Sequence, residues 1–317
     1  MCIRDSFSAI FAELLWWPWA FWVLAIACFV GAGLVWFVIP SDDLPHFRKK
    51  ATSSHHSPDK DQIPSAPEHD IGGALTGVSG LVLFNFAWNQ AAVVGWSDVY
   101  VYVLLIVSCI FLSVFGWIEV RVAKQPLVPL RALHLEAVLA LACVGVGWAS
   151  FGIWVYYEWR LIEQLRGYRA LAAAAQNVPV AVTGLLAAVS TGFLLSKIRV
   201  QWILLVALLL YLTGMILIAT VPVQQSYWYQ TFWSICIMPF GMDMSFPSGT
   251  AITSAGMTKE HQGTAASLVS TVVNYSISLG LGIAGTILRE LSQRGSSTIE
   301  TFRGAWYLGI GMQLLSR

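Results

Sequence analysis

Charged residues are scarce in this sequence, and their scarcity excludes an ordinary soluble domain. Asp, Glu, Lys and Arg make up 11% of the 317 residues, whereas 57% are hydrophobic. The formal net charge is only +1, so no excess of positive charge favours a nucleic-acid partner. A composition this apolar is typical of a protein that crosses the lipid bilayer several times.

Patterns that bind metals or form disulfides are also lacking. The five cysteines are scattered, without a CxxC pair or a Cys/His spacing that would suit zinc. His55 and His56 are adjacent, but they stand in a polar segment with no further ligand nearby. No signal peptide is visible, because the first apolar run is too long for one. We therefore expect no metal site, no cofactor and no enzymatic activity.

Long apolar runs dominate what is present. They predict helices near 16–39, 73–94, 99–118, 134–157, 170–195, 201–221, 229–251 and 264–288. A ninth run begins near 304 and stops about eight residues short of the roughly 20 that span a bilayer. The sequence thus predicts an all-α, polytopic membrane helical bundle of about nine transmembrane helices, the last one truncated. Both ends look cut, so we expect an internal piece of a longer protein.

The segment 41–72 interrupts this apolar pattern and predicts a solvated linker. It holds Arg48, Lys49, Lys50 and several prolines among scattered acidic residues. Placing it in the cytoplasm gives the cytoplasmic loops more Lys and Arg than the opposite loops, as membrane proteins prefer. The aromatic cluster at 227–229 then marks the outer membrane surface.

The stretch 236–250 is the strongest candidate for a functional site. Pro239, Asp243 and Pro247 follow one another at intervals of four, so they share one face of a helix. Each proline leaves a backbone carbonyl without its helical partner, and an ionisable residue within the membrane is a functional hypothesis by default. Two interpretations stay open: a broken helix that lines a solute path, or a kinked packing helix with Asp243 paired to a neighbour.

Amides mark two further helices. Asn85 and Asn89 share one face of the 73–94 helix, where they can hold helices together or line a cavity. Gln176 and Asn177 begin two adjacent polar stripes on the 170–195 helix, and Pro179 predicts a kink in it. The loop 158–169 mixes acidic and basic residues and is interpreted as an amphipathic outer loop.

The 264–288 helix carries one continuous stripe of small and polar residues. Its members are Ser267, Thr271, Asn274, Ser278, Gly282 and Gly285. Small residues at this spacing allow helices to approach closely, so we expect Ser278, Gly282 and Gly285 to pack. For Asn274, contact with a solute is the alternative to helix packing.

Three sequence motifs carry a family resemblance. They are the Trp-Trp-Pro-Trp-Ala-Phe-Trp run at 16–22, Phe240-Gly-Met-Asp-Met-Ser-Phe-Pro247, and Glu260-His-Gln-Gly-Thr-Ala-Ala-Ser-Leu-Val269 continuing into the Gly-rich 273–286 segment. Together they resemble fungal major facilitator superfamily transporters of the 14-helix drug:proton antiporter type, close to the aminotriazole-resistance branch. The resemblance covers nearly all of 12–315.

The resemblance implies a division of the chain into four parts. Residues 1–40 would hold the last helix of the N-terminal bundle and 41–72 a cytoplasmic linker. Residues 73–118 would form an inserted helix pair, and 133–317 a truncated C-terminal six-helix bundle. The first five helices of such a transporter are missing here, and alternating access needs two bundles around one site. We therefore expect that this chain by itself does not transport a solute.

Two alternatives come from other classes of protein. Ser245-Phe-Pro-Ser-Gly-Thr250 is similar to a motif of membrane lipid phosphatases, but Thr250 stands where that chemistry needs histidine, and only His261 follows. A non-transporting membrane protein, such as a pseudo-transporter or a sensor, is the other. An upstream open reading frame for five helices would favour a transporter.

The sequence favours one interpretation, the C-terminal part of a proton-coupled exporter of drugs or other small organic compounds. The residues expected to face the cavity are Asp243, Asn274, Gln176 and Asn177, followed by Asn85 and Asn89. The expected partners are the lipid bilayer, small amphipathic organic solutes and protons, with no nucleic acid and a monomeric state. The expected location is the plasma membrane, with the vacuolar membrane as the alternative.

Overall fold

The structure is a computed structural model, and it describes residues 9–11, 13, 16, 18–38, 71–122, 134–255, 257 and 262–315. The predicted linker lies almost wholly outside these residues, as do His55, His56 and His261. Within the described ranges the regular structure is helical, with no strand. Apart from its first two residues, the chain divides into two compact units, 3–69 and 70–317, which are described separately.

The first unit contains the helix α2, Trp19–Val38. Pro18 stands immediately before it, and its carbonyl accepts hydrogen bonds from the backbone N–H groups of Phe21 and Trp22. None of the residues of α2 is buried within the unit. Its 20 apolar residues are long enough to cross a bilayer.

The second unit begins with a hairpin of two helices, α4 (Ile71–Val94) and α5 (Val99–Arg121). The chain reverses at Gly95, whose φ of 101° suits glycine, which lacks a β-carbon. Glycines also let the two helices pack closely. A β-carbon added at Gly77 would lie 2.9 Å from the Phe115 ring, and one at Gly80 would lie 2.9 Å from the Leu112 side chain.

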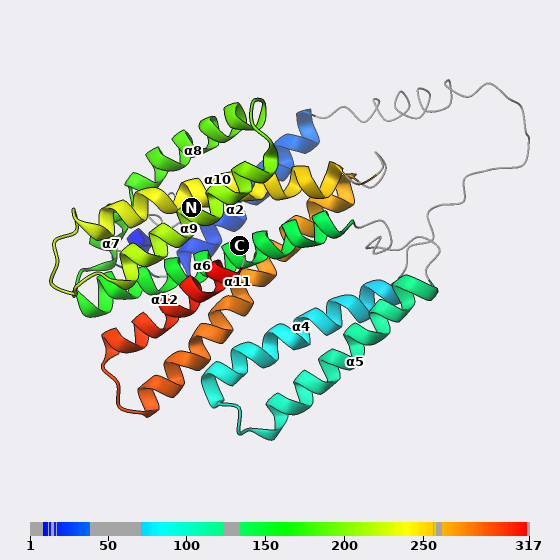
Figure 1. The fold of residues 1–317 in the computed structure, drawn as a ribbon, viewed down its shortest axis with the longest axis horizontal. Helices are drawn as coiled ribbons and strands as arrows, with labels where there is room; N and C mark the ends of the chain where they lie inside the picture. The colour runs from blue at the N-terminus through cyan, green and yellow to red at the C-terminus, as the bar shows by residue number, and fades with distance from the viewer. Residues whose placement is uncertain are drawn as a thin grey trace, which may run out of the picture. The chain divides into compact units, whose positions relative to one another are not determined.

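The rest of the second unit is a bundle around α10. Its elements are α6 (Leu135–Arg160), the π-helical turn η2 (Leu161–Leu165), α7 (Ala170–Gln176), α8 (Pro179–Leu195), α9 (Val200–Ala219), α10 (Gln230–Ala255), α11 (Gln262–Gln293) and α12 (Thr298–Leu315). Helix α10 packs against α6, α8, α9 and α11, and α12 packs against α6, α9 and α11 (Figure 1).

Large side chains fill the core of this bundle. Trp306, Tyr157, Tyr211 and Met238 are fully buried. Burying such side chains brings many atom pairs into van der Waals contact, and their individually weak attractions add up. The bundle is therefore held by dense packing of large residues.

A buried hydrogen-bonded chain links three of the bundle helices. The Trp154 indole of α6 donates to the Ser234 hydroxyl of α10 at 2.8 Å, and Ser234 donates to the Gly214 carbonyl of α9 at 2.8 Å. Each polar group in this chain finds a partner away from water, as a low-dielectric interior requires.

Seven of the described helical segments are long and apolar enough to cross a membrane. The prediction of an all-helical membrane protein is therefore confirmed. Helices α10 and α12 are not among the seven because both are less apolar: α10 contains Asp243 and many small polar residues, and α12 contains Glu300, Arg303 and Gln313. The last helix begins at Thr298, earlier than the predicted residue 304, because the chain turns at Gly295, with a φ of 79°.

One predicted boundary was wrong. Helix α6 continues to Arg160 and passes into η2, so the predicted loop from 158 begins as helix, with Glu158, Leu161 and Ile162 buried. The apolar spacing that begins at Trp154 continues through these residues, and packing extends the helix. The predicted 170–195 segment keeps both of its ends, at Ala170 and Leu195. Within it the helix is interrupted between α7 and α8, immediately before Pro179, the residue at which the sequence predicts a kink, because proline favours the first turn of a helix.

Candidate functional site

The Asp243 carboxylate lies where α8 and α10 pack together. A β-carbon added at Gly184 of α8 would be 3.8 Å from Asp243 Oδ2 and 4.0 Å from Pro239 Cβ. Asp243 and Pro239 therefore face α8 side by side, and the glycine leaves room for them. The side chain is half-buried, and it has no hydrogen bond or ion pair with another residue that the structure describes.

Helix α10 runs without interruption through Pro239 and Pro247. Neither proline has an N–H to donate, so each leaves a carbonyl four residues earlier without its helical partner. Neighbouring helices approach this backbone closely: the Tyr211 ring of α9 would lie 3.0 Å from a β-carbon at Gly241. The Tyr211 and Ser245 hydroxyls are 3.3 Å apart and share a hydrogen bond. One face of α10 is thus fixed by packing, and the Asp243 face meets α8.

A second polar cluster lies at the end of the bundle where α6 ends and α8 begins. Glu158 is fully buried, and the Asn177 side-chain amide donates to its Oε1 atom at 3.4 Å. The neighbouring Gln176 accepts a hydrogen bond on its backbone carbonyl from the Tyr227 hydroxyl at 2.5 Å. Its side-chain oxygen is buried without a hydrogen bond from any described residue. The structure therefore brings Gln176 and Asn177 together with an acidic residue that the sequence analysis had placed in a loop.

Burial shifts the pKa of two groups near the Glu158–Asn177 cluster. Burial lowers the pKa of the Arg166 guanidinium, which lies near Glu158 and donates from Nε to the Val223 carbonyl at 3.1 Å. Burial also raises the pKa of the Tyr227 hydroxyl to about 12, so this group stays protonated and can donate at neutral pH. Charged and hydrogen-bonded side chains thus lie together at this end of the bundle.

Asn85 and Asn89 point from α4 toward α11. The Asn89 amide donates to Asn85 Oδ1 at 2.9 Å and to the Ser278 hydroxyl at 3.3 Å. Ser278 in turn donates to Asn85 Oδ1 at 2.8 Å. The three side chains form a closed hydrogen-bonded triangle, an arrangement that holds two membrane helices together.

Close backbone contact continues along α11 beyond this triangle. A β-carbon at Gly282 would lie 3.3 Å from the Trp88 carbonyl carbon, and one at Gly285 would lie 2.8 Å from Ala92 Cβ. Still further along, the Arg289 guanidinium donates to the Val93 carbonyl at the end of α4. The α4–α5 hairpin therefore meets α11 through small residues and hydrogen bonds, and the two helices lie side by side in Figure 1.

Asn274 lies in the opposite direction along α11, where the two helices leave a groove. The groove has a volume of about 890 Å³, and Asn85, Asn89, Asn274 and Ser278 are among the residues that line it. Asn274 is exposed there, and its amide donates to the Ser270 carbonyl at 2.8 Å. The predicted site residues thus fall into three separate places: the Asp243 face, the Gln176–Asn177 cluster and this groove.

Sequence reasoning missed Glu158 as a member of a buried cluster. A signal was present, because Trp154, Glu158 and Leu161 follow helical spacing and continue the apolar face of the preceding helix. The charges that follow were given more weight than this spacing. The phosphatase-like motif lies within α10, where the Thr250 hydroxyl donates to the Phe246 carbonyl of its own helix at 2.9 Å.

An all-helical bundle with apolar spans and polar residues buried between its helices defines an integral, multi-pass membrane protein. The sequence profile of the Major Facilitator Superfamily matches residues 6–281. The chain therefore belongs to this family of transporters. The predicted fold and family are confirmed.

Curated relatives narrow the comparison to fungal transporters. The chain is 50% identical over 306 residues to a low affinity ammonium transporter of Saccharomyces cerevisiae, covering 96% of this chain and 57% of that protein. It is 41% identical over 305 residues to the efflux pump terJ of Aspergillus terreus, covering 96% of this chain and 56% of the pump. It is 37% identical to the aminotriazole resistance protein of Saccharomyces cerevisiae, covering 95% of this chain and 52% of that protein. The chain therefore spans a little over half the length of these relatives.

Proposed function

We propose that this chain forms the C-terminal part of a proton-coupled exporter of small organic compounds or drugs, and that Asp243 faces the solute path. The observation that carries the proposal is the half-buried carboxylate beside Gly184, without a hydrogen bond from the described residues. A carboxylate kept in a membrane bundle without such a partner is well suited to bind and release a proton or a cation. The names of the efflux pump and the aminotriazole resistance protein support export.

The division of the chain is part of this proposal. Residues 1–40 contribute the last helix of the N-terminal bundle, and 41–72 the cytoplasmic linker. The hairpin α4–α5, which contains the predicted segment 73–118, is the inserted pair, and 133–317 belong to the C-terminal bundle. We further propose a monomer in the plasma membrane, in which Gln176 and Asn177 border the outer end of the path.

A second function has its own support. The relative that is 50% identical to this chain is named as a low affinity ammonium transporter, so uptake of a small cation is the alternative. The Asp243 carboxylate suits this function as well, because it attracts a cation as readily as a proton. The two functions differ in the direction of movement and in the size of the solute.

Transport by the full-length protein tests both functions. Fungal cells that express it are loaded with radiolabelled aminotriazole, and export is followed with and without a protonophore. Uptake of radiolabelled methylammonium is measured in the same cells. We expect export that the protonophore abolishes and that Asp243→Asn slows about tenfold, equivalent to about 1.4 kcal/mol.

A matched control removes a carboxylate from the surface. Glu290 forms an exposed ion pair with Arg294 at 3.0 Å, so Glu290→Gln should leave export unchanged. Unchanged export and unchanged pH dependence in Asp243→Asn would remove Asp243 from the mechanism. Methylammonium uptake without any export would overturn the exporter in favour of the cation transporter, and movement of neither solute would favour a non-transporting protein.

A further inference from the structure

Helix α7 is a short helix between two interruptions of the chain. Before it, the π-helical turn η2 is followed by Gly167, whose φ of 72° suits glycine. No described atom lies within 4 Å of a β-carbon added at Gly167, so packing does not confine the chain there. After α7, the helix is interrupted at Asn177 and Val178, immediately before Pro179. The backbone can therefore bend at both ends of α7.

Packing holds α7 only weakly. Five of its seven residues are alanines, which bring few atoms into contact, and η2 is the element against which α7 mainly packs. Leu171, its one large apolar residue, is exposed. Helix α10, by contrast, packs against α6, α8, α9 and α11. Because segments with few buried contacts open at a lower free energy than a core, α7 should open more readily than the bundle.

Helix α7 is not needed to cross the membrane. The candidate span Ala170–Leu195 has 26 residues, of which α8 alone supplies 17. A helix of about 17 residues reaches the lower limit of the lengths that span a bilayer. Helix α7 can therefore change its direction while α8 keeps its place in the membrane.

The Tyr227 hydroxyl fastens the end of α7. The Val180 N–H donates to the Asn177 carbonyl at 3.1 Å, a spacing of three residues instead of the four of an α-helix. At this break the Gln176 carbonyl accepts a hydrogen bond from the Tyr227 hydroxyl at 2.5 Å. Because Tyr227 stands shortly before α10, this hydroxyl joins α7 to the segment that leads into the central helix of the bundle.

Asn177 forms a second link. It follows α7 directly, and its side-chain amide donates to Glu158 Oε1 of α6 at 3.4 Å. Glu158 lies within the candidate span Leu135–Leu165 and is fully buried, and Ala173 and Ala174 of α7 are buried as well. The observed position of α7 thus goes together with the burial of a carboxylate within the membrane bundle.

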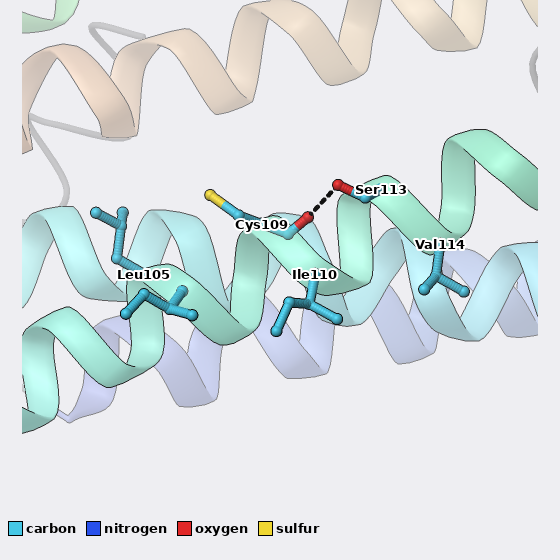
Figure 2. Close-up of a pocket in the computed structure, with 6 residues that line it drawn as sticks. Leu105, Cys109, Ile110, Ser113 and Val114 are labelled. Carbon is cyan, nitrogen blue, oxygen red and sulfur yellow. Dashed lines mark hydrogen bonds between the residues drawn. The ribbon is translucent and has the colours of Figure 1, made fainter.

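Many hydroxyls of the described helices serve only their own helix. Figure 2 shows such a case in a shallow pocket on α5, where the Ser113 hydroxyl donates to the Cys109 carbonyl at 2.7 Å. A bond of this kind satisfies the hydroxyl but joins no two elements. The Tyr227 hydroxyl bonds to a residue 51 positions away in the sequence, so its loss would release one element from another.

We propose that α7 is a hinged lid over the Glu158 carboxylate. The lid bends at Gly167 and at the break before Pro179. The hydrogen bonds from Tyr227 and Asn177 hold it shut, and its opening gives the aqueous medium access to the carboxylate. The proposal does not rest on the proposed export, because such a lid would serve the movement of a solute in either direction.

Cysteine labelling of the full-length protein measures the opening. Ala173→Cys places a thiol at a fully buried position of α7. The protein is held in nanodiscs, which leave both membrane faces open to a charged methanethiosulfonate reagent, and mass spectrometry of the peptides follows the reaction at this site alone. Tyr227→Phe keeps the ring and removes the hydroxyl. We expect it to speed the labelling about fivefold, the effect of one hydrogen bond on the open fraction.

A second variant and two controls separate the lid from a general loosening. Asn177→Ala removes the other link and should speed the labelling about twofold, because its hydrogen bond is longer. Tyr229→Phe should have no effect, since the Tyr229 hydroxyl is exposed and forms no hydrogen bond with the described residues. Ala219→Cys places a thiol at a fully buried position where α9 ends, and its labelling should stay slow in Tyr227→Phe.

Two results would overturn the proposal. An unchanged labelling rate at position 173 in both Tyr227→Phe and Asn177→Ala would show that these hydrogen bonds do not hold α7. Equal acceleration at positions 173 and 219 would show that the bundle loosens as a whole. The labelling is measured without a solute, so a failure of the lid and a failure of the proposed export are seen in different experiments.

Discussion

The α4–α5 hairpin and the α6–α12 bundle belong to the same compact unit, yet they are held by different interactions. The bundle buries Trp306, Tyr157 and Tyr211 completely, whereas the most buried side chains of α4 are alanines, Ala87 and Ala91. The hairpin meets the bundle through glycines and the hydrogen-bonded triangle of Asn85, Asn89 and Ser278. Large-residue packing is costly to disturb, whereas small-residue contacts with a few hydrogen bonds are weaker.

This difference has a consequence for function. A bundle packed by large side chains keeps its helices in fixed register and can hold a carboxylate such as Asp243 in a defined place. A hairpin attached by short contacts can leave a groove where the contacts end. The same helix, α11, takes part in both arrangements on two of its faces.

Substitution of two glycines of α11 should give the largest difference in stability between the bundle and the hairpin contact. A β-carbon at Gly280 would lie 2.9 Å from the Ala149 carbonyl oxygen of α6, whereas one at Gly282 would lie 3.3 Å from the Trp88 carbonyl carbon of α4. Gly280→Ala should reduce the free energy of unfolding by about 1–3 kcal/mol, because a backbone oxygen cannot move aside alone. Gly282→Ala should cost less than about 1 kcal/mol.

Thermal unfolding of the purified full-length protein measures both changes. The two variants make the same chemical change two residues apart on one helix, so each is the control for the other. If Gly282→Ala lowered the melting temperature as much as Gly280→Ala, the hairpin would be as tightly packed as the bundle, contrary to the comparison.

Removing the hydrogen bonds of the triangle should reduce stability moderately, and only in the hairpin. Asn85→Ala removes the acceptor for the Ser278 hydroxyl at 2.8 Å and for the Asn89 amide at 2.9 Å. A double-mutant cycle with Ser278→Ala should give a coupling energy of about 0.6 kcal/mol, the average for such bonds in membranes. Hydrogen exchange should become faster in α4 and stay unchanged in α9.

Thr76→Val is the control for this cycle. The Thr76 hydroxyl donates to the Gly72 carbonyl of its own helix at 2.7 Å and forms no hydrogen bond with the described residues of α11. A coupling energy of zero between Asn85 and Ser278, or equal acceleration of exchange in Thr76→Val, would contradict the role of the triangle.

The smallest expected effect concerns the start of α12. The Glu300 carboxylate accepts hydrogen bonds from the Ser297 backbone N–H and hydroxyl, both at 2.9 Å, and these bonds lower the pKa of Glu300. The arrangement is a capping box, whereas Asp98 makes no such side-chain bond at the start of α5. The stabilisation should be complete above about pH 4.3, the pKa of an unperturbed Glu. It should disappear as the pH falls through the lower pKa of the folded state, because protonation removes the charged acceptor.

Glu300→Gln tests this assignment. Glutamine keeps an acceptor oxygen but does not titrate, so the variant should lose the acid-dependent part of α12 protection, seen by hydrogen exchange between pH 7 and pH 3. Helix α5 should show no corresponding change at its start. Identical pH profiles for the wild type and Glu300→Gln would contradict the assignment.

The sequence alone determined the class, most of the helices and the family. Runs of apolar residues long enough to span a bilayer give helices regardless of tertiary context, since every backbone group must find a partner within its own segment. The motif around Asp243 and the Gly-rich 273–286 segment carried the family resemblance, which the comparisons confirmed. The residues proposed to face the solute stay predictions.

Only the tertiary structure decided what each polar residue contacts. A helical period says that Asn85 and Asn89 share a face, but not that Ser278, far along the chain, completes their hydrogen bonds. The sequence pattern placed Glu158 in a loop, whereas the packing of η2 buries Glu158 beside Asn177. Distances along a sequence fix which side chains share a helix face. Which faces meet depends on how closely two backbones can approach, and that is settled by long-range contacts such as those at Gly280 and Gly282.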